Sequence, residues 1–144
     1  MVFIKKLEIL GFKSFGSKNI TLNFQKGLIV VTGPNGSGKS NILDAILFAL
    51  GENSPKALRV DRFQSLFHDT STNNEANIIV RVSLTFDNTD RGIPIDKDTV
   101  TITREMYGSN SGESQYNING KRVTRNNIME LLEIVVARVL IHKK

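Results

Sequence analysis

Cysteine and tryptophan are absent from this 144-residue chain, and only three prolines and two tyrosines occur. Without cysteine the chain can form neither a disulfide nor a thiolate metal site. The most apolar stretch, residues 42–50, is short and carries Asp44, so no segment is predicted to span a membrane. The first residues show no apolar core before a cleavage site, which argues against a secretory signal. A soluble cytoplasmic protein without a membrane partner is the expectation.

The composition is that of a globular domain, with 40% hydrophobic and 23% charged residues. The length suffices for one domain with a core. The net charge of +5 weakly favours a nucleic-acid partner, because cations displace counterions from phosphates. Basic residues gather at two places, which hold Arg59 and Arg62, and Lys121, Arg122 and Arg125. The second group could contact a DNA backbone, or it could be an ordinary solvated face.

Residues 33–40 match the full phosphate-binding pattern G-x-x-x-x-G-K-[ST]. The glycines let the backbone curl so that its N–H groups point at a phosphate. Lys39 would bring a charge to the β- and γ-phosphates, and the Ser40 hydroxyl would ligate Mg²⁺. An apolar stretch precedes the pattern and a stretch of good helix formers follows, which is the strand–loop–helix geometry that binds anions. The residues expected to hold ATP and Mg²⁺ here are Gly33, Pro34, Asn35, Gly36, Ser37, Gly38, Lys39, Ser40 and Asn41.

Hydrophobic periodicity predicts the other elements. Strands are expected at residues 3–10, 19–24, 28–31, 78–86, 99–106 and 115–118, and helices at 41–50, 126–139 and briefly from Ser54. Asn119-Gly120 predicts a tight hairpin turn. This order suggests an α/β protein with a mixed sheet, in which an antiparallel β meander surrounds the phosphate-loop helix. It differs from the βαβ alternation of small GTPases and nucleoside kinases.

A complete hydrolytic site is not evident in the sequence. Phosphoryl transfer needs a further carboxylate beside Mg²⁺ and a group that positions water. No run of four apolar residues ends in Asp; residues 82–87 end in Asp87, but their alternation is typical of a half-exposed strand. Asp44, four residues after Ser40, is expected to face solvent or pair within its helix. The sequence therefore predicts nucleotide binding without a complete catalytic apparatus.

Six stretches together resemble the N-terminal head segment of SMC proteins (structural maintenance of chromosomes). They are residues 10–15, 33–41, 44–46, 54–59, 90–96 and 116–125, and the likeness extends to about Glu133. The resemblance implies a P-loop NTPase of ABC type, whose head is split between the two ends of a long polypeptide joined by a coiled coil. Residues 1–144 would form the N-terminal half of that head, with residues 126–144 as its closing helix. Residues 135–144 depart from the family's continuation.

The resemblance also implies a function. SMC heads bind and hydrolyse ATP, engage in pairs, and serve chromosome segregation and condensation at the nucleoid. The expected partners are the C-terminal half of the same head, a second head in a homodimer, DNA and a kleisin-type subunit. In this family the Walker B Asp-Glu pair and the signature motif lie in the C-terminal half, so the chain alone is expected to be inactive as an ATPase.

Further site residues follow from the resemblance alone. Lys13 and Ser14 match positions that approach the nucleotide, although a surface turn is the alternative. Arg59 matches the arginine-finger position and would act with Lys39 in catalysis, although a solvated arginine is the alternative. The residues that match the stretch beside the adenine, but that could equally be core, are Phe63, Leu66 and Phe67.

Several alternatives remain open at this point. Related heads occur in the zinc-hook double-strand-break repair ATPase and in RecF and RecN proteins, although residues 92–96 and 119–122 favour SMC. The chain could also be a non-hydrolysing, nucleotide-gated DNA-binding module, or a small P-loop kinase. Residues 109–114 loosely resemble an ABC signature but precede a strand rather than a helix. His68 has no partner at ligand spacing, which argues against a metal site.

Overall fold

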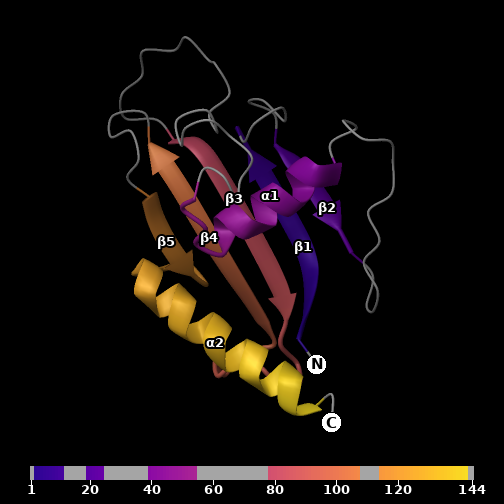
Figure 1. Ribbon diagram of the computed structural model, residues 1–144. Helices are drawn as coiled ribbons and strands as arrows, with labels where there is room; N and C mark the ends of the chain where they lie inside the picture. The colour runs from indigo at the N-terminus through magenta and orange to yellow at the C-terminus, as the bar shows by residue number, and fades with distance from the viewer. Residues whose placement is uncertain (1, 12–18, 25–38, 55–77, 108–113, 143–144) are drawn as a thin grey trace.

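The computed structural model describes residues 2–11, 19–24, 39–54, 78–107 and 114–142 (Figure 1). These residues form one sheet and two helices. In chain order the elements are β1 (Phe3–Leu10), β2 (Ile20–Asn23), α1 (Lys39–Ala49), β3 (Ile78–Asp87), β4 (Thr99–Tyr107), β5 (Ser114–Ile118), β6 (Lys121–Val123) and α2 (Arg125–His142). The six strands lie in the order β2-β1-β3-β4-β5-β6, and every neighbouring pair is antiparallel.

Both helices lie against the same face of this sheet (Figure 1). Under α1, the fully buried Phe48 packs with apolar side chains of β1 and β3, such as Leu7 and Leu84. Under α2, Ile128 packs with a second group that includes Ile102 and Tyr116. The half-buried Leu50 and Phe86 touch both groups, so the two helices share one continuous apolar layer.

The opposite face of the sheet is polar. Cross-strand hydroxyl pairs join β3 to β4, with 2.9 Å between Ser83 Oγ and Thr103 Oγ1 and 3.1 Å between Thr85 Oγ1 and Thr101 Oγ1. Such pairs stabilise neighbouring strands. Ser83 and Thr85 are each only 9% exposed, so the sequence-based prediction of a half-exposed strand was wrong here. β3 lies between β1 and β4, and both hydroxyls are paired with hydroxyls of β4.

The predicted strands and helices among the described residues are confirmed, and no end differs by more than three residues. The strand expected at residues 28–31 and the short helix expected from Ser54 lie outside the described residues, apart from Ser54 itself. All strand pairs among the described residues are antiparallel. A parallel strand, and with it a mixed sheet, could come only from the strand expected at residues 28–31, so the mixed sheet stays a prediction. Neither helix in the described part of the chain is long and apolar enough to cross a membrane.

The turn predicted at Asn119-Gly120 is confirmed. Both residues have positive φ, 51° and 81°, as a two-residue hairpin turn with the twist of its strands requires. The Asn119 side chain also accepts a hydrogen bond of 2.8 Å from the Thr101 backbone N–H. The β5–β6 hairpin is therefore fastened to the first residues of β4.

The loop of residues 88–98 is organised around one buried amide. Asn88 has no exposed surface, and its Nδ2 donates to the carbonyl oxygens of Ile93, Ile95 and Lys97 at 3.1, 2.9 and 3.0 Å. Its Oδ1 accepts from the Ile93 backbone N–H at 2.8 Å. The Ile93 and Ile95 carbonyls also accept backbone N–H groups, from Ile95 at 2.7 Å and from Lys97 at 2.8 Å. The buried amide thus joins successive backbone groups of the loop, and an amide buried there without these partners would carry a substantial penalty.

The Asn88→Asp substitution tests this role, because it keeps the shape of the side chain and removes both N–H donors. We expect a loss of about 2–4 kcal/mol in the free energy of unfolding, since carbonyl oxygens would then face a carboxylate. Urea denaturation followed by circular dichroism measures it. The matched control is Asn126→Asp in the exposed first turn of α2, where a new acid is neutral or slightly stabilising. Equal stability of the two variants would contradict the assigned role.

Candidate nucleotide-binding site

Three of the predicted nucleotide-binding residues, Lys39, Ser40 and Asn41, form the start of α1. The first turn of this helix contains no acidic residue, so its N-terminal N–H groups and positive dipole end favour an anion. The other predicted site residues lie outside the described residues, so the structure does not test them: Lys13, Ser14, Gly33, Pro34, Asn35, Gly36, Ser37, Gly38 and Arg59, together with Phe63, Leu66, Phe67, His68 and residues 109–113.

The sheet-facing side of α1 is made of small residues and one ring. Ala45 and Ala49 are fully buried, which lets the helix approach the sheet closely, and Phe48 fills the space between them. Asp44 is also buried, with 3% of its surface exposed. Of the two expectations for Asp44, exposure to solvent was wrong, because it shares the helix side of Ala45 and Phe48, whereas a pair within the helix stays a prediction. Because apolar residues surround Asp44 on both sides in the sequence, the pattern did not indicate whether its side chain faces the sheet or the solvent.

The C-terminal end of α1 closes in a Schellman motif. The Glu52 N–H donates to the Leu47 carbonyl at 3.0 Å, and the Gly51 N–H donates to the Phe48 carbonyl at 3.1 Å. Gly51 has φ of +100°, a conformation that side chains rarely adopt. A Cβ atom built there would also lie 2.6 Å from Cε of Met129 in α2. Glycine is therefore favoured by the turn, whereas the flexible end of Met129 could move aside for a Cβ atom.

Arg104 of β4 reaches across the apolar layer to this turn. Its side chain is 1% exposed, and Nη1 donates to the carbonyl oxygens of Phe48 and Glu52 at 3.0 and 2.8 Å. Nη2 donates to Asn53 Oδ1, and Nε donates to Ser114 Oγ at 2.9 Å. Burial lowers the pKa of this guanidinium to about 10, so it still carries its charge at neutral pH. The charge lies at a helix C-terminus, where the dipole favours a cation.

Two aromatic rings flank the same guanidinium. Its Cζ lies 4.1 Å from the ring centre of Phe48 and 5.1 Å from that of Tyr116 in β5. Contacts of this kind stabilise a cation that has lost its water, by about 2 kcal/mol or more when desolvated. Arg104 was not recognised from the sequence, because alternation marks it only as one more residue on the inner face of β4.

Arg125, the first residue of α2, binds the same turn from the other side. Its Nε donates to the Gly51 carbonyl at 2.8 Å. A cation is unfavourable at the N-terminus of its own helix but favourable at the C-terminus of α1, so its position is explained by α1. Residues Thr124 and Asn127 cap α2 reciprocally: Thr124 Oγ1 accepts from the Asn127 N–H at 3.1 Å, and Asn127 Oδ1 accepts from the Thr124 N–H at 3.0 Å.

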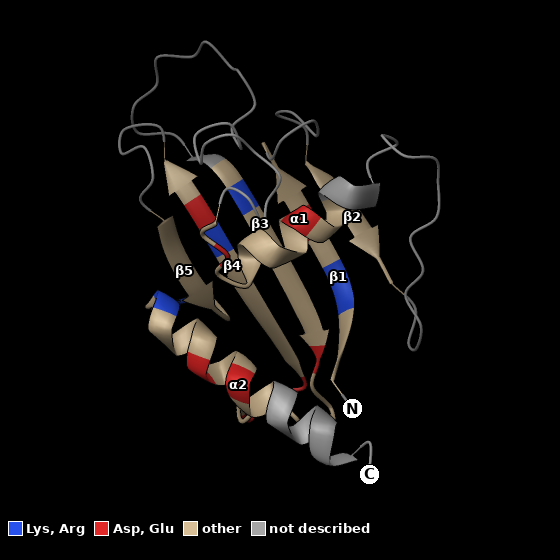
Figure 2. Cartoon of the chain, in the orientation of Figure 1, with Lys and Arg blue, Asp and Glu red and all other residues tan. Residues whose placement is uncertain are grey.

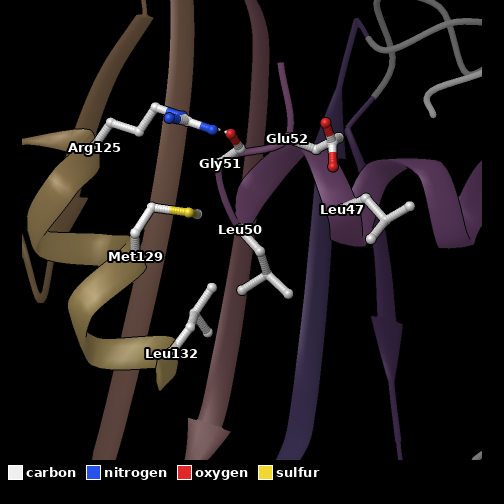
Figure 3. A pocket seen from close by; sticks show the side chains of 7 residues that line it. All are labelled: Leu47, Leu50, Gly51, Glu52, Arg125, Met129 and Leu132. Atoms are coloured by element: carbon white, nitrogen blue, oxygen red, sulfur yellow. Dashed lines mark hydrogen bonds between the residues drawn. The ribbon is translucent and has the colours of Figure 1, made fainter. Parts of the chain in front are cut away.

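A cavity of about 240 Å³ lies between the end of α1 and the start of α2 (Figure 3). Figure 3 shows Arg125 at one side, bonded to Gly51, and leucine side chains below. The residues that line it are Leu47, Leu50, Gly51, Glu52, Arg125, Met129 and Leu132. It lies at the opposite end of α1 from Lys39, so it is distinct from the predicted phosphate site.

The basic residues predicted to contact DNA are divided by the structure. Lys121 and Arg122 are exposed on β6, the last strand of the sheet, whereas Arg125 is engaged with the end of α1. Alternation along β6 places Lys121 and Arg122 on opposite faces of the sheet. Beyond its basic first turn, α2 carries acidic residues, Glu130 and Glu133 (Figure 2). Between residues 126 and 135, the cationic residues of the hairpin therefore do not continue along α2.

The two tyrosines of the chain allow a direct test of burial beside Arg104. Burial raises the pKa of Tyr116 despite the neighbouring cations, and the Tyr107→Phe variant leaves Tyr116 as the sole tyrosine. We expect its tyrosinate absorbance to appear at a pH above the usual value of about 10. Because the folded pKa is raised, the stabilising contribution of Tyr116 is complete below pH 10 and is lost as the pH rises through the folded pKa. A midpoint at or below the usual value, with circular dichroism unchanged, would contradict this environment.

Comparison with known proteins now identifies the family. The model for the RecF/RecN/SMC N terminal domain matches residues 3–138. Chromosome partition protein Smc of Pyrococcus furiosus is 47% identical over 132 residues, which are 92% of this chain and 11% of that protein. The Smc protein of Bacillus subtilis is 42% identical over 130 residues, 90% of this chain and 11% of that protein. The chain thus spans about a tenth of the length of these relatives.

Solved structures agree with this assignment. A chain from a study of ATP-driven dimerization and DNA-stimulated activation of SMC ATPases has a TM-score of 0.82 at 46% identity, covering 93% of this chain and 80% of that one. The Pyrococcus furiosus Smc head with an extended coiled coil, bound to the C-terminal domain of ScpA, has a TM-score of 0.82 at 46% identity, covering 94% and 33%. The structure of RecF with ATP has a TM-score of 0.59 at 20% identity and covers 85% of this chain and 28% of that one. At this identity the match shows a shared fold only. The chain belongs to the RecF/RecN/SMC N-terminal domain family, as its resemblance to SMC head segments predicted.

Proposed function

We propose that this chain binds ATP with Mg²⁺ as the N-terminal half of an SMC-type ATPase head. The observation that carries the proposal is the complete phosphate-binding pattern of residues 33–40, whose last two residues begin α1 on the antiparallel sheet. A helix N-terminus without acidic residues is suited to the polyphosphate. The fold match to SMC heads at 46% identity supports the same assignment.

Each predicted residue has a separate role in this proposal. The backbone of residues 33–41 cradles the phosphates, Lys39 neutralises charge, and Ser40 ligates Mg²⁺. Lys13 and Ser14 approach the nucleotide, and Arg59 reaches phosphate charge when two heads engage. The C-terminal half of the head supplies the Walker B carboxylates and the signature motif. Hydrolysis therefore belongs to the assembled head.

In the cell, this head would serve the organisation and segregation of chromosomes. The proposed partners are the C-terminal half of the head, a second identical head, DNA and a kleisin-type subunit, in the cytoplasm at the nucleoid. The kleisin proposal is supported by the Pyrococcus furiosus Smc head, which was solved bound to ScpA. Closer similarity to Smc heads than to RecF favours this function over recombination mediation.

The phosphate site is tested by calorimetry with ATP and Mg²⁺ on the 144-residue chain. We expect Lys39→Ala to abolish measurable binding, because the charge at the β- and γ-phosphates is lost. We expect Ser40→Ala to weaken mainly the dependence on Mg²⁺. Lys97→Ala, which removes a charge from the exposed loop of residues 88–98, is the matched control and should bind like the parent. Equal affinities of the parent and Lys39→Ala would refute the assignment.

The hairpin is tested by the salt dependence of duplex DNA binding. Loss of two phosphate contacts in the double variant Lys121→Ala/Arg122→Ala should lower the slope of log affinity against log salt by about 2 units. Adding Arg125→Ala extends the loss only if that side chain also reaches DNA. The effect should be similar on unrelated sequences, because phosphate contacts carry no base information.

The control for DNA binding is Lys5→Ala/Lys6→Ala on β1, which removes the same charge from another strand. Should this control and the hairpin variant lower the slope equally, net charge rather than the hairpin would account for binding. An unchanged slope in the hairpin variant would place the DNA contact elsewhere on the assembled head.

A further inference from the structure

Lys39 and Ser40, the last two residues of the phosphate-binding pattern, begin α1, and the Arg104 contacts lie at the opposite end of this helix. Helix α1 begins at Lys39 and ends at Ala49, a span of about 15 Å at 1.5 Å per residue. A hydrogen-bonded helix of this length moves as a unit. A contact that fixes the last turn of α1 therefore also fixes the orientation and the axial position of its first residues, Lys39 and Ser40.

Arg104 makes contacts that fix such a position. Four donor–acceptor pairs tie its guanidinium to two carbonyls at the end of α1, to Asn53 beyond it and to Ser114 of β5. The carbonyls of Phe48 and Glu52 lie on either side of the Gly51 turn, so the guanidinium restrains both the rotation and the axial position of the helix end. The planar fork of arginine can do this, whereas the single ammonium of lysine cannot.

A purely stabilising role explains these contacts less well. Burying a cation costs several kcal/mol, and an apolar residue of similar size often stabilises a core as much as a buried charge. What an apolar residue would not provide is a directional connection from β4 and β5 to carbonyl oxygens of the turn. A second arginine, Arg125, binds the same turn from α2. The end of α1 is thus held from two separate elements.

We propose that Arg104 is a positioning residue for nucleotide binding: by holding the last turn of α1 to β4 and β5, it fixes the helix whose first residues, Lys39 and Ser40, are proposed to bind the phosphates and Mg²⁺. The inference rests on the proposed function, since it concerns the same phosphate site. It adds a residue that does not touch the nucleotide and lies on a different strand. It also connects the β5–β6 hairpin to the C-terminal end of α1, because Ser114 and Tyr116 of β5 contact the same guanidinium.

Arg104→Lys tests the proposal in the full 144-residue chain. We expect its dissociation constant for ATP with Mg²⁺ to rise about threefold to thirtyfold. Amide hydrogen exchange along α1 should quicken in the same variant, because the helix end is no longer restrained. The matched control is Ile102→Ala, two residues earlier on β4, which is buried to the same degree and packs under α2 rather than α1. It should lower the melting temperature without changing the dissociation constant by more than about twofold.

A milder variant keeps the test decisive if Arg104→Lys does not fold. Asn53→Ala removes one exposed acceptor of the guanidinium and should raise the dissociation constant about twofold or more, whereas Asn126→Ala on α2 should not. Unchanged affinity in the Arg104 and Asn53 variants overturns the proposal. So does an equal rise in Ile102→Ala at an equal loss of melting temperature.

The two proposals fail in different ways. If the parent and Lys39→Ala bind ATP equally, the proposed function fails. Hydrogen exchange then decides the role of Arg104 by itself: unchanged exchange along α1 in Arg104→Lys overturns it, and faster exchange confined to α1 supports it.

Discussion

The contact between Arg104 and the last turn of α1 is the constraint on which this arrangement depends. A helix of 11 residues is too short to be stable alone in water, so α1 exists because other elements hold it. Phe48 and two alanines supply apolar contact with the sheet, but such contact has little direction. The guanidinium supplies the direction, and two rings offset part of the cost of burying it.

Much of the fold was predictable because its signals are local. Alternation at residues 78–86 and 99–106 predicted the two longest strands. The pair Asn119-Gly120 predicted a tight turn, and both residues have the positive φ that such a turn needs. The phosphate-binding pattern located the start of α1, because glycines followed by Lys and Ser before good helix formers have few other uses. In each case neighbours in sequence determine the structure.

What was missed depends on neighbours in space. Asp44 and Arg104 are both buried, and the burial of Arg104 follows from packing between β4 and α1, which no pattern in either segment records. Asn88 was part of a predicted polar loop, yet its amide is the buried centre of that loop. Arg125 was grouped with Lys121 and Arg122 by sequence proximity, whereas the α2 cap turns it toward Gly51. The common element is a polar side chain that is buried or engaged in a way that the pattern of apolar residues does not record.

The order of strands has a consequence for synthesis on the ribosome. β1 lies between β2 and β3, and its pairing of Leu10 with Arg81 spans the whole of α1, whereas β3 to β6 pair with their neighbours in sequence. At roughly 5–20 residues per second, β1, β2 and α1 emerge seconds before the strands that bury them. The nascent chain therefore exposes Phe48 and the apolar side of α1 until β3 and β4 have formed, which makes this interval the natural point for a chaperone to bind.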